Sequence, residues 1–253
     1  MTGESGARTR VGGLALLVLV LAGCRVDATT RVQVAEDGSG TVTVEVVLDQ
    51  EAADRIPDLA DQLQVRDLRR TGWEITGPEP ADRGGVVLTA TKAFFEPEQM
   101  ATVLAEIGGN RGPVLDPSLE RTRTFATTAY DFVGTLDLSR GIATFSDRRL
   151  TRLLDGFPIG RDQADLEAEL GAPLSELTSF TFEIVLPDGS ATQTSTWEAR
   201  LGDEPTAMAA STEERNLLAF GLAAGAALAI LLLAIVLVRR RLRGSRGPVF
   251  HRD

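Results

Sequence analysis

The alternation of apolar and polar residues predicts a domain built mainly from strands. Val42, Val44, Val46 and Leu48 recur with a period of two, and a glycine-containing turn at 36–40 precedes them. Period-two alternation behind such a turn predicts a hairpin. Strands are also predicted at 73–77, 86–95 and 123–138, with a bulge at Phe125, and a final hairpin pairs 180–186 with 192–201.

Between these strands lie segments in which apolar residues recur at helical spacing. The clearest helix, 97–107, has a proline in its first turn and an apolar stripe that includes Met100, Val103 and Leu104, and two glycines end it. Further helices are predicted after Asp49, from 146 to 154, and from 162 to 170. This pattern favours an α+β fold, in which helices pack on a largely antiparallel sheet.

The carboxyl-terminal part is predicted to be a membrane anchor. Residues 217–238 carry no charge and no proline, and as a helix they reach about 33 Å, enough to cross a bilayer. The arginine-rich tail, 239–253, is then expected in the cytoplasm. A polar linker is predicted at 202–216, between this single span and the exported domain.

The amino-terminal part is typical of a secretory signal. Two arginines precede the apolar segment 11–21, which is too short to cross a bilayer. The segment runs into Leu21-Ala22-Gly23-Cys24, which resembles the lipobox of bacterial lipoproteins. The resemblance implies a signal peptide at 1–23, an exported domain at 24–201, and a diacylglyceryl group with acyl chains such as palmitate on Cys24. An ordinary signal sequence is the alternative.

The composition restricts the chemistry. The chain has one cysteine, Cys24, and one histidine, His251. An intrachain disulfide, a zinc site of the usual kind and a Ser–His or Cys–His nucleophile pair in the middle of the chain are therefore excluded. Residues 25–216 hold 34 acidic and 18 basic side chains, a net charge of −16, which disfavours nucleic-acid binding. We expect no enzyme activity, no catalytic residue, no cofactor and no metal.

Several short segments together resemble one family. Residues 34–42, Gly72-Trp73, and Leu136-Asp137-Leu138 with the residues after it (Gly141, Phe145 and Asp147) resemble the actinobacterial LppM family of envelope lipoproteins. The resemblance implies a membrane-tethered α+β domain on the outer side of the cell membrane. It also implies binding of a membrane lipid or lipoglycan, for example of the phosphatidylinositol mannoside type.

A lipid site requires apolar side chains and a few polar groups at its mouth. Arg121 and Arg123 could contact a headgroup phosphate, with an exposed ion-paired role as the alternative. Neighbours on a strand face opposite sides, so one of Phe94 and Phe95 needs a partner outside the core. The expected ligand-binding residues, each of which also suits the core, are Trp73, Phe94, Phe95, Tyr130 and Phe132.

Two other functions stay open at this point. The domain could be a non-catalytic interaction module, an accessory subunit for an envelope enzyme or transporter, with an envelope protein as partner. It could instead be a hydrolase with two facing carboxylates, although Asp37, Asp137 and Asp147 also suit hydrogen bonding at turns, strand ends and helix starts. Tethers at both ends are expected to hold the domain at the membrane surface and to orient one face toward it.

Overall fold

The computed structural model describes residues 25–55, 65–81, 84–108, 112–145, 163–189, 191–215 and 217–244. The predicted signal peptide, Cys24, the predicted helix at 146–154 and the end of the tail lie outside the described residues. Within these ranges the chain is an α+β protein with mostly antiparallel sheets and few helices, so the predicted class is confirmed.

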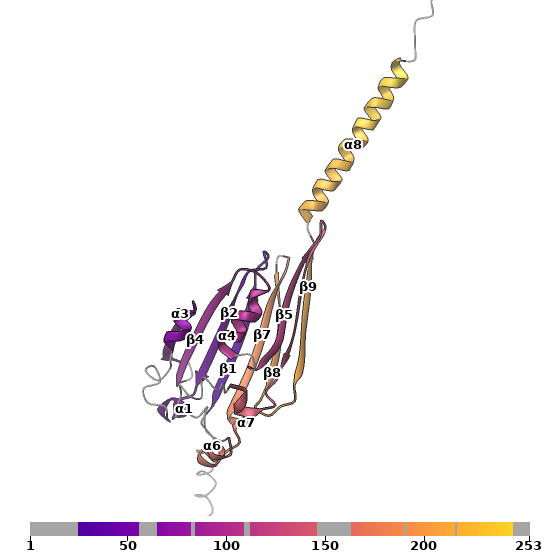
Figure 1. Cartoon of the computed structure of the whole chain (residues 1–253). Helices are drawn as coiled ribbons and strands as arrows, with labels where there is room; N and C mark the ends of the chain where they lie inside the picture. The colour runs from indigo at the N-terminus through magenta and orange to yellow at the C-terminus, as the bar shows by residue number, and fades with distance from the viewer. Residues whose placement is uncertain are drawn as a thin grey trace, which may run out of the picture.

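Six strands form the larger sheet, in the order β3-β4-β2-β1-β7-β8. All neighbouring pairs are antiparallel except β1 and β7, which run parallel (Figure 1). Both predicted hairpins are confirmed, as β1–β2 and β7–β8. The bounds are β1 (Val26–Val34), β2 (Gly40–Leu48), β3 (Glu74–Pro80), β4 (Val86–Phe94), β7 (Thr178–Asp188) and β8 (Ala191–Ala199).

The smaller sheet has the order β5-β6-β9, with β5 at Val114–Arg123 and β6 at Thr127–Leu136. The strand region predicted at 123–138 is confirmed over Thr127–Leu136 as β6, but the bulge predicted at Phe125 is a turn that joins β6 to β5, a strand that the sequence analysis missed. Thr124 closes this turn, because its backbone amide donates to the Thr127 carbonyl at 2.8 Å and its hydroxyl accepts from the Thr127 amide at 2.9 Å. A threonine in this role gives no glycine or proline signal, so alternation alone did not reveal the reversal.

The polar linker predicted at 202–216 is also wrong. Residues Thr206–Arg215 form β9, which pairs with β6 along its whole length. Met208, Ala210 and Thr212 point into the protein and are buried, while their neighbours are exposed or half-buried. The buried positions of β9 do recur with a period of two, but small and polar residues occupy most of them. The segment is therefore as polar as a linker, and its alternation is hard to recognise. The folded domain accordingly extends to residue 215.

Short helices surround the sheets. The predicted helix at 97–107 is confirmed as α4 (Gln99–Gly108), with Met100, Val103 and Leu104 buried and Ile107 partly exposed. It packs on β2, β4 and β5, and so covers the part of the larger sheet that the smaller sheet leaves open. The remaining described helices of the domain are α1 (Gln50–Arg55), α3 (Val65–Arg70), the 3-10 helix Gly141–Phe145, α6 (Gln163–Leu170) and α7 (Leu174–Leu177).

The core lies between the two sheets and under α4. Phe132 on β6 stacks on Phe182 on β7, with ring centroids 5.5 Å apart, and Trp197 on β8 packs on both rings. Phe94 packs on Gly40, where an added Cβ would lie only 2.9 Å or less from atoms of its ring. The glycine at the start of β2 therefore allows the close approach of a core ring.

A long helix, α8 (Leu217–Gly244), follows β9 and points away from the sheets (Figure 1). Among the residues that the structure describes, no helix is both long and apolar enough to cross a membrane, so the span predicted at 217–238 is not supported. The α8 side chains of residues 217–220, 223, 224, 227, 238 and 240–244 lie outside the described part of the structure.

Candidate functional site

Most of the aromatic residues predicted to bind a ligand lie in the core. Trp73, Phe94, Tyr130 and Phe132 are each at least 97% buried. The Trp73 indole donates a hydrogen bond to Glu106 at 2.9 Å, and the Lys92 ammonium contacts the same carboxylate at 2.6 Å. These rings fill the space between the layers, which is the alternative role that the sequence left open.

Phe95 is the exception among the predicted ligand-binding residues. It follows β4, its side chain is 78% exposed, and Phe94 beside it is buried. The prediction that only one of this pair lies in the core is therefore confirmed. Phe95 is placed at the end of the domain where α8 begins, because Phe94 pairs with Gly40 at the β1–β2 turn.

A pocket of about 350 Å³ opens at this same end, between the β1–β2 turn and the smaller sheet. We call it the arginine mouth. The β1–β2 turn, β5, β6 and β9 all contribute to it. Its lining residues are Glu36, Asp37, Arg121, Arg123, Thr128, Glu214 and Arg215.

The register explains how three strands present side chains to the mouth. Arg121 pairs with Tyr130, Arg123 with Thr128, and Thr128 with Glu214. Tyr130 is buried between the sheets, so its cross-strand partners face the same interior side. The core thus ends at Tyr130, and charged side chains continue the same face outward.

Arg121 is held by its surroundings. Its Nε donates to the Glu36 backbone carbonyl at 3.1 Å, and its guanidinium lies over the Tyr130 ring, 5.9 Å from the centroid. Gly38 in the facing turn has a φ of +90°, and a Cβ there would lie 2.8 Å from the Arg121 Cδ. The glycine therefore both allows the turn and leaves room for the arginine stem.

Arg123 and Arg215 differ from Arg121. Within the described ranges of the chain, neither guanidinium has a hydrogen bond or an ion pair. Two of the carboxylates in the mouth are already engaged: Asp37 accepts from Ser39, and Glu214 accepts from the Gly189 amide at 3.0 Å. The mouth therefore holds two cationic groups whose donors are available to an anion.

Asp37 stabilises the turn at the rim of the mouth. Its Oδ1 accepts from the Ser39 hydroxyl at 2.6 Å and from the Ser39 amide at 3.0 Å. The side-chain hydrogen bond, followed by the backbone one, holds the pKa of Asp37 below its ordinary value, and the charge of Arg121 acts in the same direction. Asp137 makes the same pair of bonds with Ser139 at the end of β6, and its pKa is lowered for the same first reason.

Two polar groups lie at the inner side of the mouth. Burial raises the pKa of the Tyr130 hydroxyl, which donates to the Glu36 carbonyl at 2.6 Å. Thr212 pairs with Tyr130, is 93% buried, and its Oγ1 has no hydrogen-bond partner among the described residues. A polar layer therefore separates the aromatic core from the charged groups.

The sequence indicated only part of this site. Arg121 and Arg123 were singled out as phosphate contacts, and the structure brings them together at the mouth. Glu214 and Arg215 were missed because their strand was assigned to a linker. The alternation of Met208, Ala210 and Thr212 is the signal that could have placed them on a sheet. Asp147 lies outside the described residues.

Metal binding finds no support in the described part of the chain. No group of three or more histidine, cysteine, aspartate or glutamate side chains there could hold a metal ion. The carboxylates that we considered for catalysis, Asp37 and Asp137, each hold a serine of a local turn.

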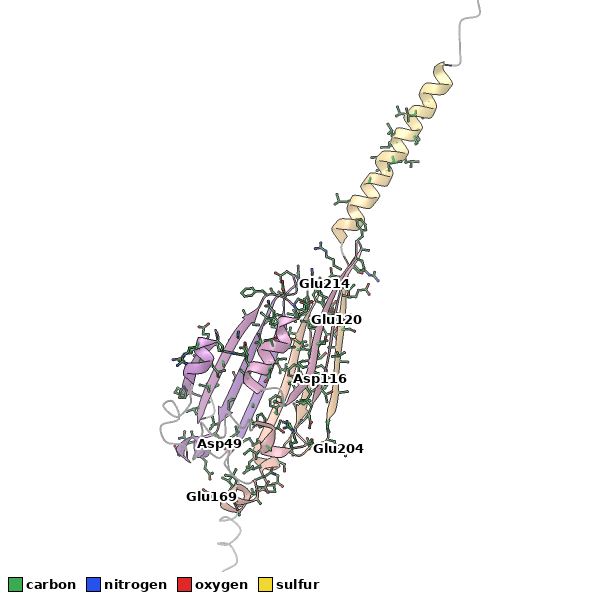
Figure 2. All side chains as sticks on the ribbon, in the orientation of Figure 1. Asp49, Asp116, Glu120, Glu169, Glu204 and Glu214 are labelled. Carbon is green, nitrogen blue, oxygen red and sulfur yellow. The ribbon has the colours of Figure 1, made fainter. Side chains whose placement is uncertain are left out.

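The two ends of the domain carry different features. Glu214 lies near α8, whereas Asp49 and Glu169 lie at the opposite end (Figure 2). Arg25, which directly follows Cys24, bonds to Asp49 through its amide at 2.7 Å, so β1 starts at the end remote from α8. Nine residues of strand, about 30 Å, separate the start of β1 from the β1–β2 turn at the mouth.

Comparisons with known proteins give one weak likeness. The chain is similar to the solved folded domain of LppM from Mycobacterium tuberculosis, with a TM-score of 0.35 and 9% identity, over 77% of this chain and 92% of that chain. A TM-score at this level carries no argument about fold or function. No family model and no curated protein matches the chain.

Proposed function

We propose that this protein is a non-catalytic envelope lipoprotein whose exported domain binds the phosphate-bearing headgroup of envelope lipids or lipoglycans at the arginine mouth. The observation that carries the proposal is the pair Arg123 and Arg215, whose guanidinium groups have no partner in the described residues and share one pocket. The family resemblance of the sequence motivates the class of ligand.

The chemistry of the mouth suits a phosphate better than other groups. A guanidinium presents planar N–H donors that match two oxygens of a phosphate, and such charge-assisted hydrogen bonds are about twice as strong as neutral ones. The rest of the domain is strongly acidic and repels anions at long range. An anion that binds here must therefore be recognised locally, which favours a ligand already concentrated at the site.

A membrane close to the mouth would supply that concentration. In the turn of α8 at 230–233 large apolar side chains are exposed on every side, because Ile230, Leu231, Leu232 and Leu233 are each at least 54% exposed. Four consecutive residues cover all faces of a helix, and a helix that is apolar all round requires an apolar surrounding. We therefore keep membrane insertion of α8 as part of the proposal.

The connection to α8 fixes the position of the mouth. Arg215 ends β9 and Leu217 begins α8, so a single residue separates a lining residue of the mouth from the helix. The Cα atoms of Arg215 and Leu217 are therefore at most about 7 Å apart. If α8 is in the bilayer, the arginine mouth lies at the level of the headgroups.

This proposal differs from the apolar cavity that the sequence suggested. The predicted rings of Trp73, Phe94, Tyr130 and Phe132 are occupied in core packing, so the proposed contact is with the headgroup, and the acyl chains stay in the bilayer. The headgroup phosphate would bridge Arg123 and Arg215, and the sugar or inositol hydroxyls would face Glu36 and Thr128.

The predicted lipid on Cys24 adds a geometric condition. Arg25 lies at the far end of β1, about 30 Å from the mouth, and no free chain is left between it and the sheet. Two anchors in one bilayer therefore require the long axis of the domain to lie along the membrane surface. A domain standing upright on α8 would keep Cys24 out of reach of the same bilayer.

Native mass spectrometry of the full-length protein, released from detergent in the presence of phosphatidylinositol or phosphatidylcholine, tests the proposal. We expect retained phosphatidylinositol, and its loss in the double variant Arg123→Ala/Arg215→Ala. Arg31→Ala is the matched control, because Arg31 is paired with Glu183 on the outer face of the larger sheet. Equal retention of both lipids, or none, would refute headgroup recognition and favour a protein-interaction module.

A further inference from the structure

The turn between β5 and β6 carries an exposed aromatic side chain, that of Phe125. Phe125 is 67% exposed at the tip of this hairpin, where a bulky apolar side chain has no partner among the described residues to cover it. The hairpin tip reaches the start of α8 (Figure 1). An exposed aromatic ring beside an apolar helix is the arrangement found at membrane interfaces.

The strand register places Phe125 at the same end of the domain as the start of α8. Thr127 on β6 pairs with Arg215 on β9, and the two strands are antiparallel. The turn residue Phe125 and Leu217, the first residue of α8, therefore both lie just beyond this last pair of the β6–β9 ladder, at the same end of the domain.

The turn holds this ring in place. The Thr124 hydroxyl accepts from the amides of Ala126 and Thr127, at 3.3 and 2.9 Å, and the Thr124 amide donates to the Thr127 carbonyl. The amides of Thr124, Ala126 and Thr127 are thus satisfied within the turn. Such a tip enters a headgroup layer at a lower cost than a turn with free amides.

We propose that the β5–β6 turn is a membrane-interface anchor: Phe125 inserts into the acyl–headgroup boundary beside α8 and limits the tilt of the domain so that the arginine mouth faces the headgroups. This inference rests on the proposed membrane location of α8. It holds for a domain that stands on the bilayer and for one that lies along it, because Phe125 lies at the same end of the domain as the start of α8 in both cases.

The anchor adds a role that headgroup binding does not require. Arg123, in the mouth, is two residues before Phe125, so an inserted ring limits how far the mouth can turn away from the surface. The lipid proposed on Cys24 lies at the opposite end of the domain, so α8 joined through one residue would leave the mouth end free to tilt away from the membrane surface. The ring supplies a contact beside α8 that limits this tilt.

Tryptophan fluorescence of the full-length protein, reconstituted in phosphatidylcholine vesicles with and without brominated acyl chains, tests this anchor. After subtraction of the wild-type signal, we expect Phe125→Trp to show a blue-shifted emission that brominated lipid quenches. Val133→Trp is the matched control: Val133 is 52% exposed on the outer face of β6, about 20 Å from the hairpin end. The emission of Trp at position 133 should be red-shifted, as for a water-exposed indole, and brominated lipid should not quench it.

Three results would overturn the anchor. An unquenched Trp at position 125 in protein that floats with the vesicles would refute insertion while leaving α8 in the membrane. Equal quenching at 125 and 133 would show that the whole outer face of the smaller sheet contacts lipid. Protein that fails to float with the vesicles would remove the anchor together with the membrane location on which it rests. Because these vesicles carry no anionic lipid, a failure of headgroup recognition leaves the readout unchanged.

Discussion

The Tyr130 hydroxyl donates a hydrogen bond to the Glu36 backbone carbonyl at 2.6 Å and so joins the smaller sheet to the β1–β2 turn of the larger one. Glu36 and Tyr130 are 94 residues apart in the chain. The same carbonyl accepts from the Arg121 Nε, and Asp37 and Ser39 close the turn beside it. One carbonyl therefore sets the distance between the two walls of the arginine mouth.

Replacing Tyr130 with phenylalanine removes this hydroxyl and keeps the ring in the core. The free energy of unfolding should fall by about 1 kcal/mol, because Arg121 still satisfies the Glu36 carbonyl. Chemical denaturation of the variant and the wild type measures the difference. A loss as large as that of a core cavity would mean that the ring itself had moved.

Phe94 and Phe95 should respond in opposite ways to the same change. Phe94→Ala leaves a cavity beside Gly40 and should lower the free energy of unfolding by about 3–5 kcal/mol. Phe95→Ala changes an exposed side chain and should stay within about 0.5 kcal/mol of the wild type. Thermal unfolding of the two variants compares them directly, and similar losses would show that the exposed and buried assignments are wrong.

The corrected domain boundary can be tested by truncation. A chain that ends at residue 201 lacks β9, which exposes the β6 edge and the interior side of the smaller sheet, so it should not fold. A chain that ends at residue 215 keeps the whole sheet and should fold. Amide dispersion in two-dimensional NMR spectra distinguishes the two. A folded 25–201 fragment would return residues 202–216 to the role of a linker.

Asp37 and Asp137, which each accept hydrogen bonds from a serine in a local turn, should have lowered pKa values. Because hydrogen bonds from Ser39 and Ser139 lower the pKa of Asp37 and Asp137 in the folded protein, each turn is stabilised at pH values above the ordinary aspartate range. That contribution is lost as the pH falls through the lowered pKa. Carboxyl NMR titration should show a lowered pKa for both Asp37 and Asp137. The substitution Ser39→Ala should raise the pKa of Asp37 and leave that of Asp137 unchanged. An ordinary pKa for Asp37 in the wild type would contradict the turn geometry.

Much of the fold was predictable because large β-branched and aromatic residues carry the alternation in the larger sheet. Val32, Val42, Phe182 and Ile184 are fully buried, and their hairpins were predicted at these positions. The α4 helix was predictable for a similar reason, since proline, apolar stripe and glycine all agree. Local pattern and tertiary packing are consistent in these elements.

The smaller sheet was harder to predict because its signals are weak. β5 contains Asp116 and Pro117 at a register shift, and β9 buries alanine, threonine and methionine in place of larger residues. The arginine mouth depends on that sheet, so of its three arginines only Arg121 and Arg123 were found in advance. The pairing of Tyr130 with Glu36 over 94 residues has no local signature and follows only from the packing of the two sheets.

The most direct test of headgroup recognition is an NMR titration of the arginine Nε–Hε signals in the detergent-solubilised full-length protein with glycerophosphoinositol. The account predicts saturable shifts for Arg123 and Arg215, a smaller one for Arg121, and none for Arg31, which is paired with Glu183. Unchanged signals at Arg123 and Arg215, or equal shifts at Arg31, would contradict it.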